Sequence, residues 1–143
     1  MNGLISKFGF YRSNMRETVI DPKAEKKLIQ GAYRKLLKSI KVDMDATDRR
    51  NIRTAYELAV QAHSKQRRKS GEPYILHPIE VARICAEEIG LGPTAIVAAL
   101  LHDVVEDTDV SLLKIQEQFG DKVSMIVNGL TKLDGLYNVA SPQ

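Results

Sequence analysis

Titratable side chains are concentrated in one apolar segment, Ala-Leu-Leu-His-Asp-Val-Val-Glu-Asp, at residues 99–107. A charged group is rarely buried unless a partner or an ion compensates for it. The apolar character of residues 93–107 predicts one continuous central helix. On such a helix the four titratable side chains fall within an arc of about 140°. They are His102, Asp103, Glu106 and Asp107.

The carboxyl end of a helix is an unfavourable place for carboxylates, because the helix dipole is negative there. A bound divalent cation would offset this cost and the repulsion among the acids. Adjacent imidazole and carboxylate groups suit Mn²⁺, Fe²⁺, Mg²⁺ or Zn²⁺. The alternative is a solvated helix end beside a core histidine that is satisfied by hydrogen bonds. The segment alone leaves both interpretations open.

A second candidate is the basic loop within residues 63–78, which read HSKQRRKSGEPYILHP. Arg67, Arg68 and Lys69 precede Ser70 and Gly71, so cations, a hydroxyl and the amides of a turn occur together. This combination can contact a phosphate or a nucleotide. The alternative is a solvated basic loop, which most such runs are.

Two further histidines flank this loop. His77 comes directly before Pro78 at the predicted start of a helix. It is either a metal ligand or a capping residue. His63 lies on the apolar side of the preceding helix and competes with His77 as a candidate. We predict that His63 is a core histidine or one that supports a ligand from behind.

Helical periodicity extends over nearly the whole chain, which predicts an all-α fold packed around one core. Caps and breakers define the segments: Asp21-Pro22 opens a helix, Gly71 and Pro73 lie in a loop, and Ser111 caps a short helix. The predicted helices cover residues 22–41, 46–66, 77–89, 93–107, 111–119 and 121–130. The tail, residues 134–143, has the composition of a loop.

The composition excludes several classes of protein. A length of 143 residues allows one domain with a real core. The net charge of +3 is too small to indicate a nucleic-acid partner, and no aromatic residues alternate with the basic cluster. The single cysteine rules out an intrachain disulfide and a site of several thiolates. No run is apolar enough for a membrane span, and we expect a cytoplasmic protein without a membrane partner.

Three motifs in sequence order resemble one known family. RKSGEPYILHPIEVA (68–82), LLHDVVEDTD (100–109) and NGLTKL (128–133) are similar to the hydrolase domain of RelA/SpoT-type bifunctional (p)ppGpp synthetase/hydrolases. These enzymes are HD-domain metal-dependent phosphohydrolases. The resemblance implies an HD-type helical bundle, with an N-terminal helical segment at residues 1–45 and a partial hydrolase domain at residues 46–143.

The resemblance also implies a role for each site residue. His77, His102 and Asp103 match the family's metal ligands, and the family's metal is Mn²⁺. Glu106 and Asp107 match an acidic pair that positions or activates the attacking water. The segment that contacts the guanine nucleotide corresponds to Arg68, Lys69 and Ser70. The family removes the 3′-pyrophosphate of guanosine tetra- or pentaphosphate, and other domains of a longer parent could contact the ribosome.

The chain departs from the family pattern in one respect. The family's fourth metal ligand is an aspartate in a later helix, and no residue up to Gln143 matches it. We therefore expect the N-terminal part of a longer hydrolase. Two alternatives stay open: a catalytically silent nucleotide-binding or regulatory module, and an HD phosphohydrolase that acts on another class of nucleotide.

Overall fold

The computed structural model describes residues 21–140, and the side chains among them up to residue 133. Within these residues the fold is helical, as the sequence predicts, with only an isolated β-bridge between Arg67 and Pro73. The elements are α2 (Pro22–Ser39), α3 (Ala46–Ala62), α4 (Leu76–Ile84), the π-helical turn η1 (Cys85–Ile89), α5 (Pro93–Leu101), α6 (Val104–Asp107), α7 (Leu112–Phe119) and α8 (Asp121–Ala140).

Side-chain caps define where several helices begin. The carboxylate of Asp21 accepts a hydrogen bond from the amide of Lys23, and Pro22 is the first residue of α2. Asp45 and Asp48 form a reciprocal capping box at α3. Ser111 accepts from the amide of Lys114 at α7, 3.1 Å away. Each cap satisfies an amide that the first helical turn leaves without a backbone partner.

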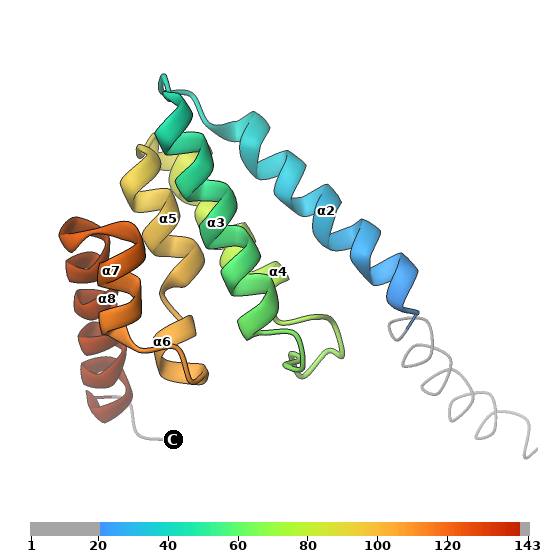
Figure 1. Ribbon diagram of the computed structural model, residues 1–143. Coiled ribbons are helices and arrows are strands. Elements are labelled where there is room, and N and C mark those ends of the chain that lie inside the picture. Colours follow the sequence, from blue (N-terminus) through green and yellow to red (C-terminus); the bar gives the residue numbers. More distant parts are fainter. Residues whose placement is uncertain (1–20, 141–143) are drawn as a thin grey trace, which may run out of the picture.

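The centre of the molecule is α5. Its residues 96–101 are all buried, and it packs against α3, α4 and α8. Figure 1 shows α2 on one side of the molecule and α7 with α8 on the opposite side. The largest fully buried apolar side chains come from almost every helix: Leu36, Ile52, Ile79, Ile96, Leu100, Leu101 and Ile115. The prediction of a central apolar helix is therefore confirmed.

The predicted continuous helix from 93 to 107 is wrong. Helix α5 ends at Leu101, a turn covers His102 and Asp103, and α6 resumes at Val104. The carbonyl of Ala99, which an unbroken helix would direct to the amide of Asp103, lies 2.6 Å from Nδ1 of His102. The arc calculated for an ideal helix therefore does not describe the four titratable side chains.

Two other boundaries differ from the sequence prediction by four residues or more, and α2 ends at Ser39, two residues earlier than predicted. Helix α3 ends at Ala62 with His63 as its C-cap, four residues earlier than predicted. The tail is not a loop, because α8 continues to Ala140. The one glycine of the tail, Gly135, does not end the helix, because a helical glycine costs only about 1 kcal/mol relative to alanine. Residues 141–143 lie outside the described residues.

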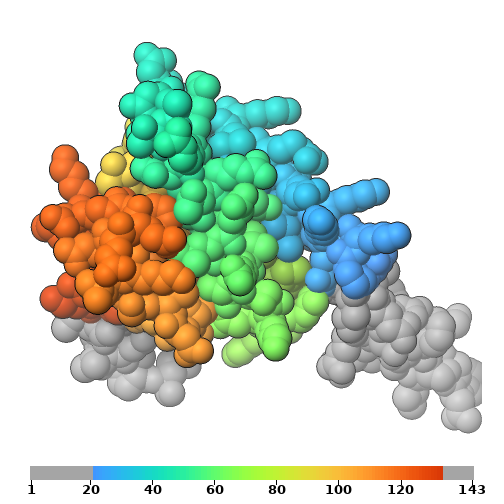
Figure 2. Space-filling model, in the orientation of Figure 1, coloured from blue at the N-terminus to red at the C-terminus, as the bar shows by residue number. Residues whose placement is uncertain are grey.

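Helix α2 is an outer, basic element that packs on α4. Its buried side chains are Leu36 and Tyr33, and the ring of Tyr33 stacks on Tyr56 of α3. In the space-filling view, long side chains project outward from it (Figure 2). No helix among the described residues is both long enough and apolar enough to cross a membrane.

Candidate functional site

A cluster of three potential ligands joins α4 to the turn after α5. His77 is the second residue of α4, and His102 with Asp103 forms the turn. One donor atom from each side chain can be chosen so that all three lie within 4.8 Å of one another. Nε2 of His102 is 3.2 Å from Oδ1 of Asp103. Two imidazoles and one carboxylate form a donor set that fits a divalent transition metal.

The loop before α4 fixes the position of His77. The amide of Tyr74 donates to the carbonyl of Gln66 at 3.0 Å, and the amide of His77 donates to the carbonyl of Tyr74 at 2.9 Å. Pro78, the next residue, is buried. The loop therefore folds back on itself, and its hydrogen bonds hold His77 beside the cluster at the start of α4.

The turn fixes His102. With Nδ1 directed to the carbonyl of Ala99 at 2.6 Å, Nε2 is the nitrogen that faces Asp103. A proton on Nδ1 would satisfy that carbonyl and leave the lone pair of Nε2 available. This is the usual arrangement of a metal-binding histidine, whose second nitrogen is held by a backbone or carboxylate oxygen.

Tyr74 contacts the cluster, although the sequence analysis gave it no role. Its hydroxyl donates to Oδ2 of Asp103 at 2.6 Å. Its ring lies 5.8 Å from that of His77 and 4.9 Å from that of His63, measured between ring centres. Burial, and then the hydrogen bond to Asp103, raise the pKa of Tyr74, so the phenol stays protonated and acts as a donor.

His63 lies outside this cluster. It is buried at 1% exposure, and Nδ1 contacts Oε1 of Gln66. Its ring contacts that of Tyr74 in the loop, and it is not one of the three clustered side chains. Its position agrees with the predicted supporting role.

Burial lowers the pKa of His77, and the nearby charge of Arg68 lowers it further. The charge of Asp103 raises the pKa of His77, and the charge of His102 lowers it. A lowered pKa favours the neutral imidazole, which is the form that binds a metal.

The acidic pair that follows the cluster is exposed. Glu106 and Asp107 lie on α6, one turn beyond Asp103. The charge of Asp107 contributes to the raised pKa of Tyr74, which indicates that this carboxylate faces the same region.

Arg68, Lys69 and Ser70 are exposed and line one hollow of about 550 Å³, which we call the basic-loop hollow. Tyr74 lines it too, so the hollow adjoins the cluster. Arg67, by contrast, is engaged: it pairs with Glu25 of α2 at 2.6 Å and donates to the carbonyl of Gly71 at 2.9 Å. The loop therefore holds one arginine in place and presents the next two cations outward.

Gly71 makes the tight turn of this loop. Its φ of +94° lies in the left-handed region, where side chains other than hydrogen are strained. Its amide donates to the carbonyl of Arg68 at 2.8 Å. The glycine of the SGEP motif is thus required by backbone conformation.

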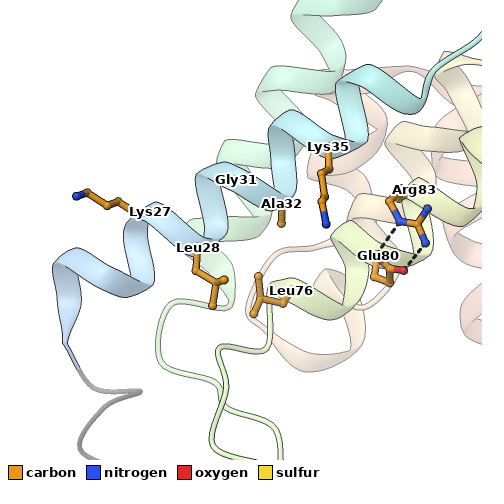
Figure 3. Close-up of a pocket in the computed structure, with 8 residues that line it drawn as sticks. All are labelled: Lys27, Leu28, Gly31, Ala32, Lys35, Leu76, Glu80 and Arg83. Carbon is orange, nitrogen blue, oxygen red and sulfur yellow. Dashed lines mark hydrogen bonds and ion pairs between the residues drawn. The ribbon is translucent and has the colours of Figure 1, made fainter.

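A second hollow, the α2–α4 groove, lies elsewhere and encloses about 420 Å³. Figure 3 shows Leu28 of α2 facing Leu76 of α4, with Lys27 and Lys35 on the α2 side. On the α4 side, Arg83 pairs with Glu80. None of the residues that the sequence predicted for the site lines this groove.

Comparison with known proteins gives a family match and named relatives. A family model described as HD domain matches residues 55–143. A GTP pyrophosphokinase of Streptomyces coelicolor is 38% identical over 130 residues, which are 91% of this chain and 14% of that protein. A guanosine-3′,5′-bis(diphosphate) 3′-pyrophosphohydrolase of Aquifex aeolicus is 50% identical over 82 residues, 57% of this chain and 12% of that protein.

A third relative is the bifunctional (p)ppGpp synthase/hydrolase SpoT of Escherichia coli, which is 47% identical over 87 residues. That alignment covers 61% of this chain and 12% of SpoT. The chain thus spans about one eighth of the length of these relatives.

Proposed function

This chain belongs to the HD domain family, and from that membership we propose that it is a hydrolase that releases pyrophosphate from the 3′ position of (p)ppGpp. An HD hydrolase domain implies a divalent metal. The observation that carries the proposal is the convergence of His77, His102 and Asp103 within 4.8 Å, next to a hollow lined by cations. The names of the relatives supply the substrate class.

We propose that the three clustered side chains bind Mn²⁺. The lowered pKa of His77 and the orientation of His102 support neutral imidazole donors, and Asp103 supplies one negative charge. When bound, the ion supplies Lewis acidity that acidifies water and polarises a phosphoryl oxygen. Two imidazoles with one carboxylate suit Mn²⁺ but also Fe²⁺ or Zn²⁺, so the test below compares metals.

The exposed acids of α6 carry the proton chemistry in this proposal. Glu106 or Asp107 orients the attacking water and accepts its proton. Water adds to the phosphorus attached to the 3′ oxygen, and the bond between that phosphorus and oxygen breaks. The proton that the acid accepted from water passes to the 3′ oxygen, which leaves as a hydroxyl. The products are pyrophosphate and GDP or GTP, so atoms and charge balance.

The basic-loop hollow binds the nucleotide. Arg68 and Lys69 have no ion pair within the part of the chain that the structure describes, and both point toward solvent. Together with the hydroxyl of Ser70 they can hold phosphate oxygens through charge-assisted hydrogen bonds. A polyanion bound in this hollow would lie beside the three clustered side chains.

We further propose the domain division predicted from the sequence, with residues 1–45 as an N-terminal segment, of which residues 1–20 lie outside the described residues, and 46–143 as part of the hydrolase domain. The HD match begins at residue 55, within α3, which supports the boundary. A cytoplasmic location also belongs to this proposal.

The test is pyrophosphate release from ppGpp by this chain, with Mn²⁺, Zn²⁺ or Mg²⁺, beside the His102→Ala variant. The proposal predicts metal-dependent release that is greatest with Mn²⁺ and absent in the variant. Release that persists in His102→Ala would contradict it. A folded chain that binds ppGpp without turnover would favour a silent binding module, and turnover of a cyclic dinucleotide or a deoxynucleotide instead of ppGpp would favour another HD phosphohydrolase.

A further inference from the structure

We propose that Tyr74 is a positioning residue for the metal site: its hydroxyl holds Asp103 in the orientation that binds the ion. This inference rests on the proposed function, because it assigns Asp103 to the metal. It goes beyond the proposed function by giving a role to a side chain that contacts a ligand rather than the ion.

The two oxygens of Asp103 have different partners. Oδ2 accepts the hydrogen bond from Tyr74 at 2.6 Å, and Oδ1 lies 3.2 Å from Nε2 of His102. The phenol of Tyr74 therefore occupies Oδ2 with its hydrogen bond, and Oδ1 stays beside Nε2 of His102. Asp103 itself is buried at 7% exposure, where a fixed hydrogen bond restricts rotation of the carboxylate.

The phenol is itself held from several directions. The amide of Tyr74 donates a hydrogen bond to the carbonyl of Gln66, and the carbonyl of Tyr74 accepts one from the amide of His77. Its ring contacts those of both His63 and His77, and Nδ1 of His63 in turn contacts Oε1 of Gln66. A donor that is held in this way fixes a ligand at no further cost in side-chain entropy when the metal binds.

Tyr74 also belongs to both parts of the site. It lines the basic-loop hollow together with Arg68 and Lys69, and it contacts Asp103. The same loop that presents cations to a nucleotide therefore also orients a metal ligand. The sequence separation of 29 residues between Tyr74 and Asp103 explains why spacing alone did not reveal the contact.

The simpler explanation is that Asp103 only satisfies a half-buried phenol, since buried tyrosine hydroxyls usually find a partner. The two explanations predict different results for removal of the hydroxyl. If Asp103 only satisfies the phenol, removal of the hydroxyl lowers the free energy of unfolding. If the hydroxyl positions Asp103, its removal lowers the affinity for the metal. The chain offers a matched control in Tyr56, which is 9% exposed and stacked on Tyr33 with ring centres 3.8 Å apart, away from the cluster.

The experiment measures Mn²⁺ affinity by calorimetric titration, and thermal unfolding without metal, for the wild-type chain, Tyr74→Phe and Tyr56→Phe. Loss of a group that orients a metal ligand typically reduces affinity by about 10- to 100-fold. We expect that reduction in Tyr74→Phe, and a change of less than about 2-fold in Tyr56→Phe, because its ring packing is kept and it touches no ligand. If Tyr74→Phe does not fold, Tyr74→Met also removes the hydroxyl and can fill the gap with a flexible side chain.

The outcomes separate this inference from the proposed function. Wild-type affinity in a folded Tyr74 variant would overturn the positioning role and leave the proposed metal site intact. Equal losses in the Tyr74 and Tyr56 variants would also overturn it, because the loss would then follow general destabilisation. A wild-type chain that binds no Mn²⁺ would overturn the proposed function, and this inference with it.

Discussion

The basic-loop hollow and the α2–α4 groove both present basic side chains, yet their surroundings differ. The first shares Tyr74 with a cluster of three potential metal ligands. The second is lined by the apolar side chains of Leu28 and Leu76, and its arginine, Arg83, is paired with Glu80 and Glu87. Basic side chains around a hollow therefore do not identify a site by themselves. What distinguishes the first hollow is that its cations lie beside the cluster of three potential metal ligands.

The electrostatics make the same distinction. The charge of Arg68 reaches the cluster, where it lowers the pKa of His77. In the groove, by contrast, the charge of Arg83 is compensated within α4 and η1 by two glutamates. If this comparison is correct, substitutions at the two hollows should have unequal effects on the reaction.

The largest effect is expected at the acids that flank the cluster. Glu106→Gln and Asp107→Asn each keep the size of the side chain but remove a proton acceptor. We expect kcat for ppGpp to fall by about 10²- to 10⁴-fold in the variant that removes the general base, and less in the other. Mn²⁺ affinity should stay near that of the wild type in both, because neither residue belongs to the cluster. Values of kcat within about 10-fold of wild type in both variants would contradict the assignment.

A smaller effect is expected from the cations, and here the two hollows can be compared directly. Arg68→Ala removes hydrogen bonds to a charged group, worth about 1.5–3 kcal/mol, so KM for ppGpp should rise by about 10- to 100-fold. Lys35→Ala removes a cation from the α2–α4 groove and should change KM by less than about 2-fold, as exposed surface substitutions usually do. Steady-state kinetics at saturating Mn²⁺ measures both. Equal effects at the two positions would remove the distinction between the hollows.

The smallest effect concerns pH and needs no metal. The pKa of His77 in the folded chain is below its ordinary value of 6.5, so near that pH the unfolded chain binds more protons. The stability contributed by neutral His77 is therefore complete above about pH 6.5 and decreases as the pH falls, by at most about 1.4 kcal/mol per pH unit for one proton. Denaturant unfolding with EDTA between about pH 5 and pH 8 measures this slope. His77→Gln should reduce it, and an unchanged slope would show that other groups cause it.

The sequence predicted the parts of this molecule that depend on local chemistry. Asp21-Pro22 and Ser111 act as helix starts because a cap needs only neighbouring residues. The all-α fold and the buried α5 follow from apolar periodicity. The resemblance to RelA/SpoT-type proteins, based on three motifs, is confirmed by the HD domain match and by the named relatives.

The features that the sequence did not predict depend on competition and on long-range contact. The break between α5 and α6 arises where the His102 side chain meets the carbonyl of Ala99, and hydrophobic periodicity carries no information about that competition. The continuation of α8 to Ala140 overrides the turn-forming composition of its last residues. The contact of Tyr74 with Asp103 joins two segments far apart in sequence, so only the fold reveals it.

The most direct test of the account begins with this chain after dialysis against EDTA and removal of the chelator. The chain is then titrated with Mn²⁺, and electron paramagnetic resonance measures the free ion. We predict that wild-type protein and Lys35→Ala each bind one Mn²⁺ with the same affinity, and that His77→Ala loses this binding. That result would establish that α4 and the turn after α5 build one metal site. If the wild-type chain binds no Mn²⁺, or if His77→Ala binds it as tightly, the three converging side chains are not the metal site and the proposed hydrolase mechanism is wrong.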